Sequence, residues 1–216
     1  MNAPRVDVRL KSPFTAVVAG PTGSGKTEML FNLIRNKENV CTDPPVEVVY
    51  CYGAWQEKFE RLMEETGTKF HRGLPNVERD IANDGNPRWL IIDDLMEEGS
   101  GKTQTNDLYT KHSHHRNISV FFVVQNLFKK ENRTLSLNTH YLFLFKNPRD
   151  KQVVVSLAKQ AFPGKVAGVR KAYEMATEEP FSCLLIDMKQ TTPESVRLLG
   201  NYAHPSRAMR VFQVMD

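Results

Sequence analysis

The stretch from Gly20 to Thr27 constrains this chain more than any other part of its sequence. It fits the pattern G-x-x-x-x-G-K-[ST] at every fixed position, and its residues are Gly20-Pro21-Thr22-Gly23-Ser24-Gly25-Lys26-Thr27. An apolar run (Phe14–Ala19) precedes it and a helical pattern (Glu28–Arg35) follows it. Glycines let the backbone curl so that its N–H groups point inward, which makes an anion nest at the start of a helix. The sequence therefore predicts a phosphate-binding loop between a strand and a helix.

The polar side chains at the end of this loop indicate which ligands it binds. Lys26 is expected to reach the β- and γ-phosphates of a nucleoside triphosphate, and the Thr27 hydroxyl to coordinate Mg²⁺. Glu28 completes the set of residues expected at the nucleotide. A glycine-rich turn that fits the pattern by chance is the alternative, and the correctly placed strand and helix argue against it. We expect ATP and Mg²⁺ as the ligands.

The composition is that of an ordinary globular protein with a small excess of positive charge. The chain has 216 residues, of which 40% are hydrophobic and 25% charged, and its formal net charge is +4. This length suits a single domain over residues 1–216, with 1–12 as an N-terminal arm and 164–216 as the C-terminal part. The positive charge suits a polyanionic partner without requiring one.

The cysteines and the apolar runs bear on the compartment. The three cysteines, Cys41, Cys51 and Cys183, are an odd number, and the last two lie in strand-like runs, so we expect buried, reduced thiols. With no signal peptide apparent, we expect a protein that is not secreted. No apolar stretch approaches the ~18 residues of a membrane span, so no membrane is expected.

Apolar runs alternate with helical patterns along the chain, which predicts a parallel sheet covered on both faces. The expected strands are Phe14–Ala19, Val46–Tyr52, Trp89–Ile92, Ile118–Val124, Tyr141–Phe145 and Phe181–Met188, with a last one within Met209–Met215. The expected helices are Lys26–Arg35, Trp55–Thr66, Thr105–His114, Asp150–Ala161 and Val166–Ala176. In the second helix, Trp55, Phe59, Leu62 and Met63 share one face, which we expect in the core.

The run Trp89–Ile92 ends in two carboxylates, Asp93 and Asp94. After a phosphate-binding loop, a buried strand of this kind directs its first acid at the Mg²⁺ shell, and the neighbouring acid can orient a water against the γ-phosphate. We assign Asp93 to the metal and Asp94 to the water, with Glu97 or Glu98 as the alternative base. A pair of helix-capping aspartates is the other interpretation.

The strand Ile118–Val124 ends in Gln125, a polar residue in a suitable place to contact the γ-phosphate or the attacking water. We expect this strand to lie between those that carry the loop and Asp93. Gln125 would then distinguish triphosphate from diphosphate and pass that difference on to residues 126–137. A polar residue that merely ends a strand is the alternative.

Four further stretches, together with the loop and the acidic strand, resemble one known family. They are His114-His115-Arg116-Asn117-Ile118-Ser119-Val120, Val124-Gln125-Asn126-Leu127-Phe128, Arg133-Thr134-Leu135-Ser136-Leu137-Asn138-Thr139-His140-Tyr141 and Phe145-Lys146-Asn147-Pro148-Arg149-Asp150. The chain resembles viral genome-packaging ATPases of the FtsK/HerA-like superfamily. It is most similar to those of Polinton elements, adintoviruses and virophages, and more distantly to the poxvirus type. The likeness covers most of residues 14–163.

This resemblance implies a P-loop NTPase of the additional-strand, RecA/FtsK-like kind, an α/β fold whose central, mostly parallel sheet is sandwiched by helices. It also implies an ATP-driven double-stranded DNA translocase that fills a capsid. The expected partners are duplex DNA, capsid or portal-vertex proteins, and further copies of the chain in a ring of five or six. The expected location is the host nucleus or a cytoplasmic virus factory, with transient attachment to the capsid.

In such a ring, ATP lies at subunit interfaces, where a neighbouring subunit can complete the site. The residues assigned above include no second cation for the charge of the transition state, and a finger arginine from a neighbour is worth roughly 10³–10⁵ in rate. The candidates are Arg149, Arg116 and Arg133, of which we favour the first two. A surface arginine or a local salt bridge is the alternative for each.

A packaging motor must move any sequence, so its DNA contacts should go to phosphates. Basic groups gather in two places, which are Lys111 with residues 112–116, 129, 130 and 133, and the helical group Lys165, Arg170 and Lys171. A solvated charged face explains either cluster equally well.

Three other functions compete with this one. A P-loop kinase of nucleotides or small molecules would need an arginine-bearing lid, which the sequence does not indicate. A GTPase would place its guanine-reading motif after a late strand, whereas the similar run Asn36–Asn39 directly follows the loop helix. A module that uses ATP only to hold a ring together would assemble without turnover.

Overall fold

The computed structural model describes residues 6–95, 116–127 and 138–214, and these build one sheet with the strand order β3-β2-β4-β5-β1-β6-β7-β8-β9. The strands are β1 (Thr15–Ala19), β2 (Glu47–Tyr52), β3 (Lys69–Arg72), β4 (Arg88–Asp93), β5 (Ile118–Val124), β6 (Tyr141–Phe145), β7 (Cys183–Asp187), β8 (Leu198–Gly200) and β9 (Arg210–Phe212). From β3 to β6 all neighbours are parallel, and β7, β8 and β9 pair antiparallel. The predicted α/β fold with a mostly parallel sheet is confirmed.

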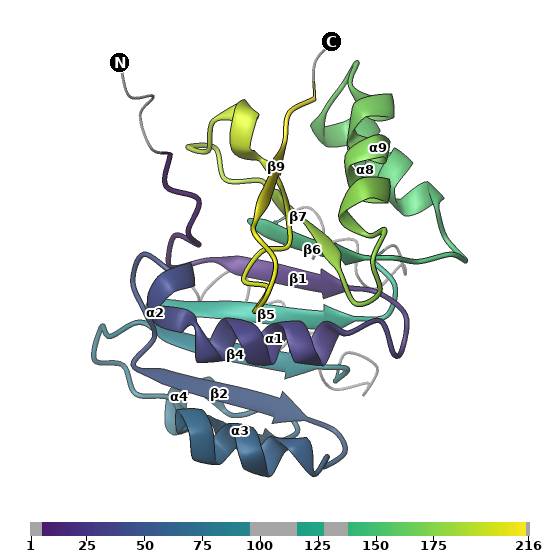
Figure 1. The fold of residues 1–216 in the computed structure, drawn as a ribbon. Helices are drawn as coiled ribbons and strands as arrows, with labels where there is room; N and C mark the ends of the chain where they lie inside the picture. Colours follow the sequence, from purple (N-terminus) through teal and green to yellow (C-terminus); the bar gives the residue numbers. More distant parts are fainter. Residues whose placement is uncertain (1–5, 96–115, 128–137, 215–216) are drawn as a thin grey trace.

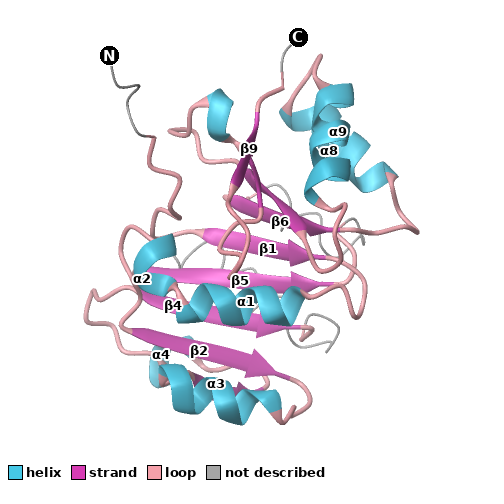
Figure 2. Cartoon of the chain, viewed as in Figure 1, coloured by secondary structure: helices cyan, strands magenta, loops and turns pink. Residues whose placement is uncertain are grey.

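Helices cover both faces of this sheet (Figures 1 and 2). They are α1 (Lys26–Arg35), α2 (Lys37–Val40), α3 (Lys58–Thr66), α4 (Val77–Asp80), α8 (Gln152–Ala161) and α9 (Val166–Ala176), with a short 3-10 helix η3 (Glu194–Val196). Apolar residues of α1, α2 and α3 belong to the core cluster on one face, and those of α4, α8 and α9 to the cluster on the other.

Alternation along each central strand explains how one sheet supports two cores. In β5, Val120 and Phe122 pack into the cluster beneath α8 and α9, while Phe121 and Val123 pack into the cluster beneath α1. Side chains of a strand point alternately to opposite faces, so a strand covered on both sides is apolar at every position. All seven residues of β5 are buried, including Ser119.

The central elements match the prediction more closely than those at the periphery. The bounds of β5, β6, α1 and α9 are those expected from the sequence, and a strand forms within Met209–Met215 as β9. The helix expected at Trp55–Thr66 begins only at Lys58, that at Asp150–Ala161 begins at Gln152, and the strand expected at Phe181–Met188 is limited to Cys183–Asp187. The helix expected at Thr105–His114 lies outside the described residues.

The expectation that Trp55 and Met63 are core residues is wrong. Each is 44% exposed, whereas Phe59 and Leu62 are fully buried. Trp55 precedes the first turn of α3, so helical spacing does not place it on the buried face, and its ring packs edge-on against Tyr52 and Phe59.

The cysteines agree with the prediction, since Cys41, Cys51 and Cys183 are free and buried. Burial raises the pKa of the Cys51 and Cys183 thiols to about 12. Among the described helices, none is long and apolar enough to cross a membrane.

Candidate nucleotide-binding site

The loop from Gly20 to Thr27 leaves the end of β1 and enters α1, as the motif requires. The N–H of Gly20 donates to the carbonyl of Val124 (3.2 Å), which ties the start of the loop to the end of β5. A Cβ at Gly20 would lie 2.6 Å from Phe145 Cβ and 2.8 Å from Ser24 Oγ, so only glycine fits there. Gly25, at the N-cap of α1, has φ 100°, a backbone conformation that glycine adopts without steric cost. Both glycines are therefore needed for the curl of this loop.

Lys26 folds back over the loop. Its Nζ donates to the carbonyls of Gly20 (2.6 Å) and Pro21 (3.0 Å). Burial lowers the pKa of Lys26, while the nearby carboxylates of Asp93 and Asp94 oppose that change. The ammonium group thus lies at the loop and within the field of the acidic strand, as a γ-phosphate ligand requires.

The loop also contains a polar atom that its own chain does not satisfy. In the described part of the chain, Ser24 Oγ is buried and has no hydrogen-bond partner. Buried polar atoms in native proteins nearly always have partners. An anion in the nest of loop amides would supply one, so the loop fits a bound phosphate.

The predicted metal residues, Thr27 and Asp93, share one neighbour that the sequence did not identify. Tyr50, on β2, is fully buried, and its hydroxyl donates to Asp93 Oδ2 (2.6 Å). A hydrogen bond with Thr27 acts on the same phenol and lowers its pKa, although burial raises that pKa overall. One hydroxyl therefore connects the threonine after the loop lysine to the carboxylate at the end of β4.

Burial is also the main influence on Asp93, and it raises the pKa of this carboxyl above the ordinary value of 3.8. The hydrogen bond from Tyr50 and the charge of Lys26 lower that pKa in part. Burial disfavours the ionised form of this carboxylate, and a cation beside it would stabilise that form. This environment fits Mg²⁺, which usually takes one or two carboxylates together with substrate phosphates.

The residues predicted to orient the water and to detect the γ-phosphate contact each other. Gln125 Nε2 donates to Asp94 Oδ2 (3.0 Å), and both side chains are exposed. Asp94 has φ 56°, a left-handed conformation that is uncommon for residues other than glycine and occurs mainly at turns and functional sites. Since β5 pairs with both β1 and β4, the expected central position of the Gln125 strand is confirmed.

These groups line one cavity of about 400 Å³ at the edge where the parallel strands end. Its lining includes Lys26, Thr27, Asp93, Asp94 and Gln125. A larger hollow, of about 630 Å³, lies between α8, α9 and the segment after β6. That hollow includes no residue of the loop or of the ends of β4 and β5. The smaller cavity is therefore the candidate for nucleotide and metal.

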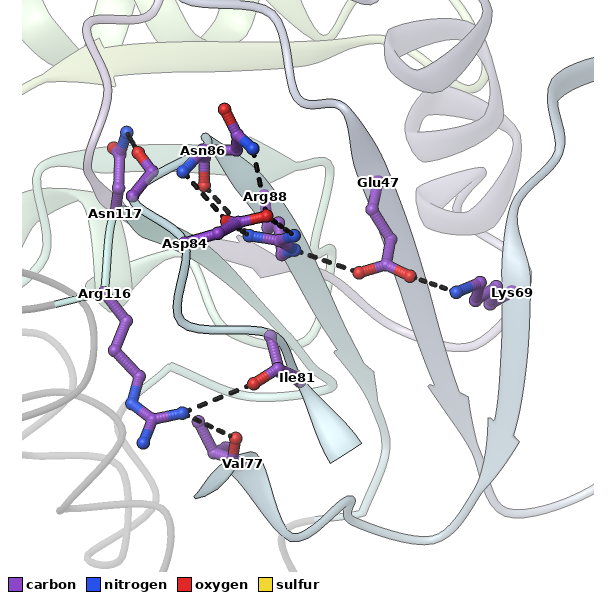
Figure 3. A network of polar contacts seen from close by, with 10 residues as sticks. Glu47, Lys69, Val77, Ile81, Asp84, Asn86, Arg88, Arg116 and Asn117 are labelled. Carbon is purple, nitrogen blue, oxygen red and sulfur yellow. Dashed lines mark hydrogen bonds and ion pairs between the residues drawn. The ribbon is translucent and has the colours of Figure 1, made fainter. Parts of the chain in front are cut away.

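The two favoured arginines lie at opposite ends of the parallel strands. Arg149, after β6, is exposed at the edge where the loop lies. Arg116 precedes β5, whose first residue pairs with the first residue of β4. Its Nη1 donates to the carbonyls of Val77 (3.0 Å) and Ile81 (3.3 Å), as Figure 3 shows. Arg116 thus has a structural role within its own chain.

The other candidates divide between described and undescribed residues. Lys165, Arg170 and Lys171 lie at the start and on the surface of α9, where Arg170 Nε is 3.8 Å from Glu174 Oε1. The alternative bases, and the first basic cluster apart from Arg116, lie outside the described residues, namely Glu97, Glu98, Lys111 to His115, Lys129, Lys130 and Arg133.

No family model matches this chain, and no curated protein matches it. Its fold is similar to the crystal structure of B204, the DNA-packaging ATPase from Sulfolobus Turreted Icosahedral Virus. The TM-score is 0.51 at 10% sequence identity, over 94% of this chain and 98% of that one. What the two chains share is the fold.

Tyr50 could not be identified from the sequence, because nothing in an apolar strand indicates what a hydroxyl contacts. The signal available was indirect, since a tyrosine within a buried strand usually needs a hydrogen-bond partner. The sequence did not place β2 in the sheet; the structure pairs it with β4, which brings Tyr50 beside the strand that ends in Asp93.

Proposed function

We propose that this chain is an ATP-hydrolysing motor that moves double-stranded DNA into a viral capsid. One observation carries the proposal, which is that the loop lysine, Thr27, Asp93 and the Asp94–Gln125 pair meet at a single cavity. The protein of similar fold is described as a DNA-packaging ATPase, and this supports the choice among P-loop functions. The FtsK/HerA-like affiliation is part of the same proposal.

The chemistry follows from the positions of the side chains. With ATP bound, Lys26 exchanges the carbonyls of Gly20 and Pro21 for phosphate oxygens. Thr27 and Asp93 would hold Mg²⁺, and the ion would supply charge neutralisation at the phosphates. Asp94 orients a water for in-line attack on the γ-phosphorus and accepts its proton, and the bond from that phosphorus to ADP breaks.

Gln125 connects hydrolysis to the rest of the motor. Its amide contacts Asp94 in the structure, and a γ-phosphate in the cavity competes for that amide. Loss of the phosphate returns the contact to Asp94. Because Gln125 directly follows β5, this exchange acts on the segment that continues from that strand.

The site becomes complete only in a ring of five or six subunits. We propose that Arg149 of one subunit reaches the ATP of the next, because its side chain is exposed at the nucleotide edge. Arg116 is the weaker candidate, since its guanidinium already holds two carbonyls of its own chain. Duplex DNA in the ring, capsid or portal proteins, and a place in the nucleus or a virus factory complete the proposal.

The test is ATPase activity measured with and without duplex DNA over a salt series, beside particle mass with and without ATP. We expect DNA to stimulate turnover, salt to weaken that stimulation steeply, and ATP to favour the ring. Lys26→Ala should abolish turnover, whereas Lys159→Ala, at an exposed position on α8, should not. ATPase activity that is the same with and without DNA at every salt concentration would refute translocation. Unchanged activity in Lys26→Ala would exclude the proposed nucleotide site.

A further inference from the structure

Phe181 has an exposed apolar side chain and an unfavourable backbone conformation. Its side chain is 68% exposed, and its backbone has φ 62°. It follows Pro180 in a turn that the N–H of Ser182 closes onto the carbonyl of Glu179 (3.4 Å). The third position of such a turn favours glycine when φ is positive, and a bulky residue there is a genuine outlier. Both the exposure and the backbone cost free energy, and strain of this kind is concentrated at ligand sites.

The ring lies directly against the phosphate-binding loop. A Cβ at Gly25 would be 2.9 Å from Phe181 Cβ and 3.2 Å from Phe181 Cδ1. Phe181 comes two residues before β7, whose first residue pairs with Phe145 at the end of β6. Figure 1 shows the segment between α9 and β7 reaching the N-terminal end of α1.

Arg207 stabilises this turn through two contacts. Arg207 Nη1 donates to Ser182 Oγ (2.9 Å), and its Nη2 lies 3.7 Å from Glu179 Oε2. One guanidinium therefore contacts the residues at both ends of the turn. This support holds Phe181 in position before any ligand arrives, which reduces the entropy cost of binding.

The order of the strands indicates which part of a nucleotide reaches Phe181. The residues for the γ-phosphate and metal, Asp93 and Gln125, follow β4 and β5 on one side of the loop strand β1. Phe181 lies on the other side of β1, next to β6 and β7. A triphosphate whose γ-end lies at Asp93 has its nucleoside at the opposite end of the loop.

We propose that Phe181 is the platform on which the nucleobase of the bound nucleotide stacks, an inference that rests on the proposed nucleotide site. The ligand class is a flat heteroaromatic base, and purines should stack better than pyrimidines because their π-surface is larger. Trp55, another exposed ring, already packs against Tyr52 and Phe59. Phe181 has no contact with the ring of another described residue and is 68% exposed, so its face is available.

The experiment measures affinity for two magnesium complexes by calorimetry, a non-hydrolysable ATP analogue and inorganic tripolyphosphate, which lacks the base. The variants are Phe181→Ala, Phe181→Gly and Phe181→Trp. Glycine tolerates the positive φ, so this variant should fold even if alanine does not. Removing the ring should weaken the ATP analogue about 5- to 150-fold, the range for loss of a stacked base. Binding of tripolyphosphate should stay within about twofold, by the same reasoning.

Phe181→Trp should keep the affinity for the ATP analogue, and the new indole fluorescence should be quenched by the analogue but not by tripolyphosphate. Equal weakening of both ligands in Phe181→Ala and Phe181→Gly would assign Phe181 to support of the loop, and no weakening would also overturn the proposal. A folded wild-type protein that binds neither ligand would instead refute the nucleotide site itself. Lys26→Ala, which should weaken both ligands, separates these results.

Discussion

Replacing Tyr50 by phenylalanine would remove one hydroxyl from the centre of the candidate site and leave the ring in place. The ring packs against Phe31, Phe59 and Phe70, with centroids 6.1, 5.3 and 5.4 Å away, and phenylalanine keeps all three contacts. What is lost is the hydrogen bond of 2.6 Å to Asp93 Oδ2 and the link to Thr27. The perturbation is therefore confined to the polar side of one buried residue.

The size of the effect depends on the charge of Asp93. A hydrogen bond to a charged group contributes about 1.5–3 kcal/mol, against about 0.5–1.5 kcal/mol for a neutral pair. At neutral pH we expect Tyr50→Phe to lower the free energy of unfolding by about 1.5–3 kcal/mol. In a domain of this size, that corresponds to a fall in Tm of about 3–12 °C.

The stability difference between Tyr50→Phe and the wild type should depend on pH, and the pKa of Asp93 sets the direction of that dependence. Burial raises the pKa of Asp93 in the folded protein, so stability is lost as pH rises through that pKa. The Tyr50 hydroxyl lowers this pKa, and its removal raises the pKa further. The variant therefore loses more stability on ionisation than the wild type. The difference between them should be largest at neutral pH and should shrink as pH falls through the pKa of Asp93 towards 3.8.

The assay is denaturant unfolding of both proteins from pH 3.8 to pH 8, with Tyr202→Phe as the matched control. Tyr202 is also buried, but its hydroxyl donates to neutral carbonyls, those of Val40 (2.9 Å) and Val8 (3.3 Å). Its removal should cost about 0.5–1.5 kcal/mol at every pH in this range. A second measurement is the Mg²⁺ concentration for half-maximal ATPase activity, which should rise in Tyr50→Phe because Asp93 is less well oriented.

The reasoning would be refuted if Tyr50→Phe lowered the free energy of unfolding no more than Tyr202→Phe does, and by the same amount at each pH. The hydroxyl would then contribute only as a neutral hydrogen bond, and the ionised carboxylate would have another source of stabilisation.

Two further predictions concern the chemical step. Asp94→Asn should bind ATP but hydrolyse it about 10²–10⁴ times more slowly in single-turnover assays, because a positioned base is lost. Normal turnover in that variant would transfer the role to Glu97 or Glu98. Arg149→Ala should bind ATP and lower turnover by roughly 10³–10⁵. Mixing it with Lys26→Ala should restore part of the activity, since each variant supplies what its neighbour lacks, and absence of any recovery would exclude Arg149 as the finger.

Elements with a strong local pattern could be predicted from the sequence. The loop helix α1 and the strand β5 have the expected bounds, because an amphipathic repeat and a fully apolar run are legible without knowledge of neighbours. β3 was missed because its sequence, Lys69-Phe70-His71-Arg72, is mostly polar, and it pairs with β2 alone at the edge of the sheet. β8 was missed because three residues are too few to show a period.

The candidate site divides in the same way. The motif predicts that Lys26 and Thr27 lie at the phosphates, and the end of an apolar strand predicts Asp93 and Asp94 for the metal and the water. The bond between Gln125 and Asp94 joins residues 31 positions apart, and that between Tyr50 and Asp93 joins residues 43 apart. Contacts of this kind depend on strand register, which neither residue's local sequence specifies.

The sequence by itself determined that this chain has a glycine-rich loop of the phosphate-binding pattern at the start of a helix, an acidic strand and a parallel sheet buried on both faces. These features follow from periodicity and from the few residue types that such a loop tolerates. Only the tertiary structure decided that Tyr50 joins Thr27 to Asp93, that Arg116 holds its own chain, and that Phe181 lies over Gly25. The reason is that crossover connections and strand order bring distant residues together, and the free energy of those contacts is gained only when the whole sheet forms.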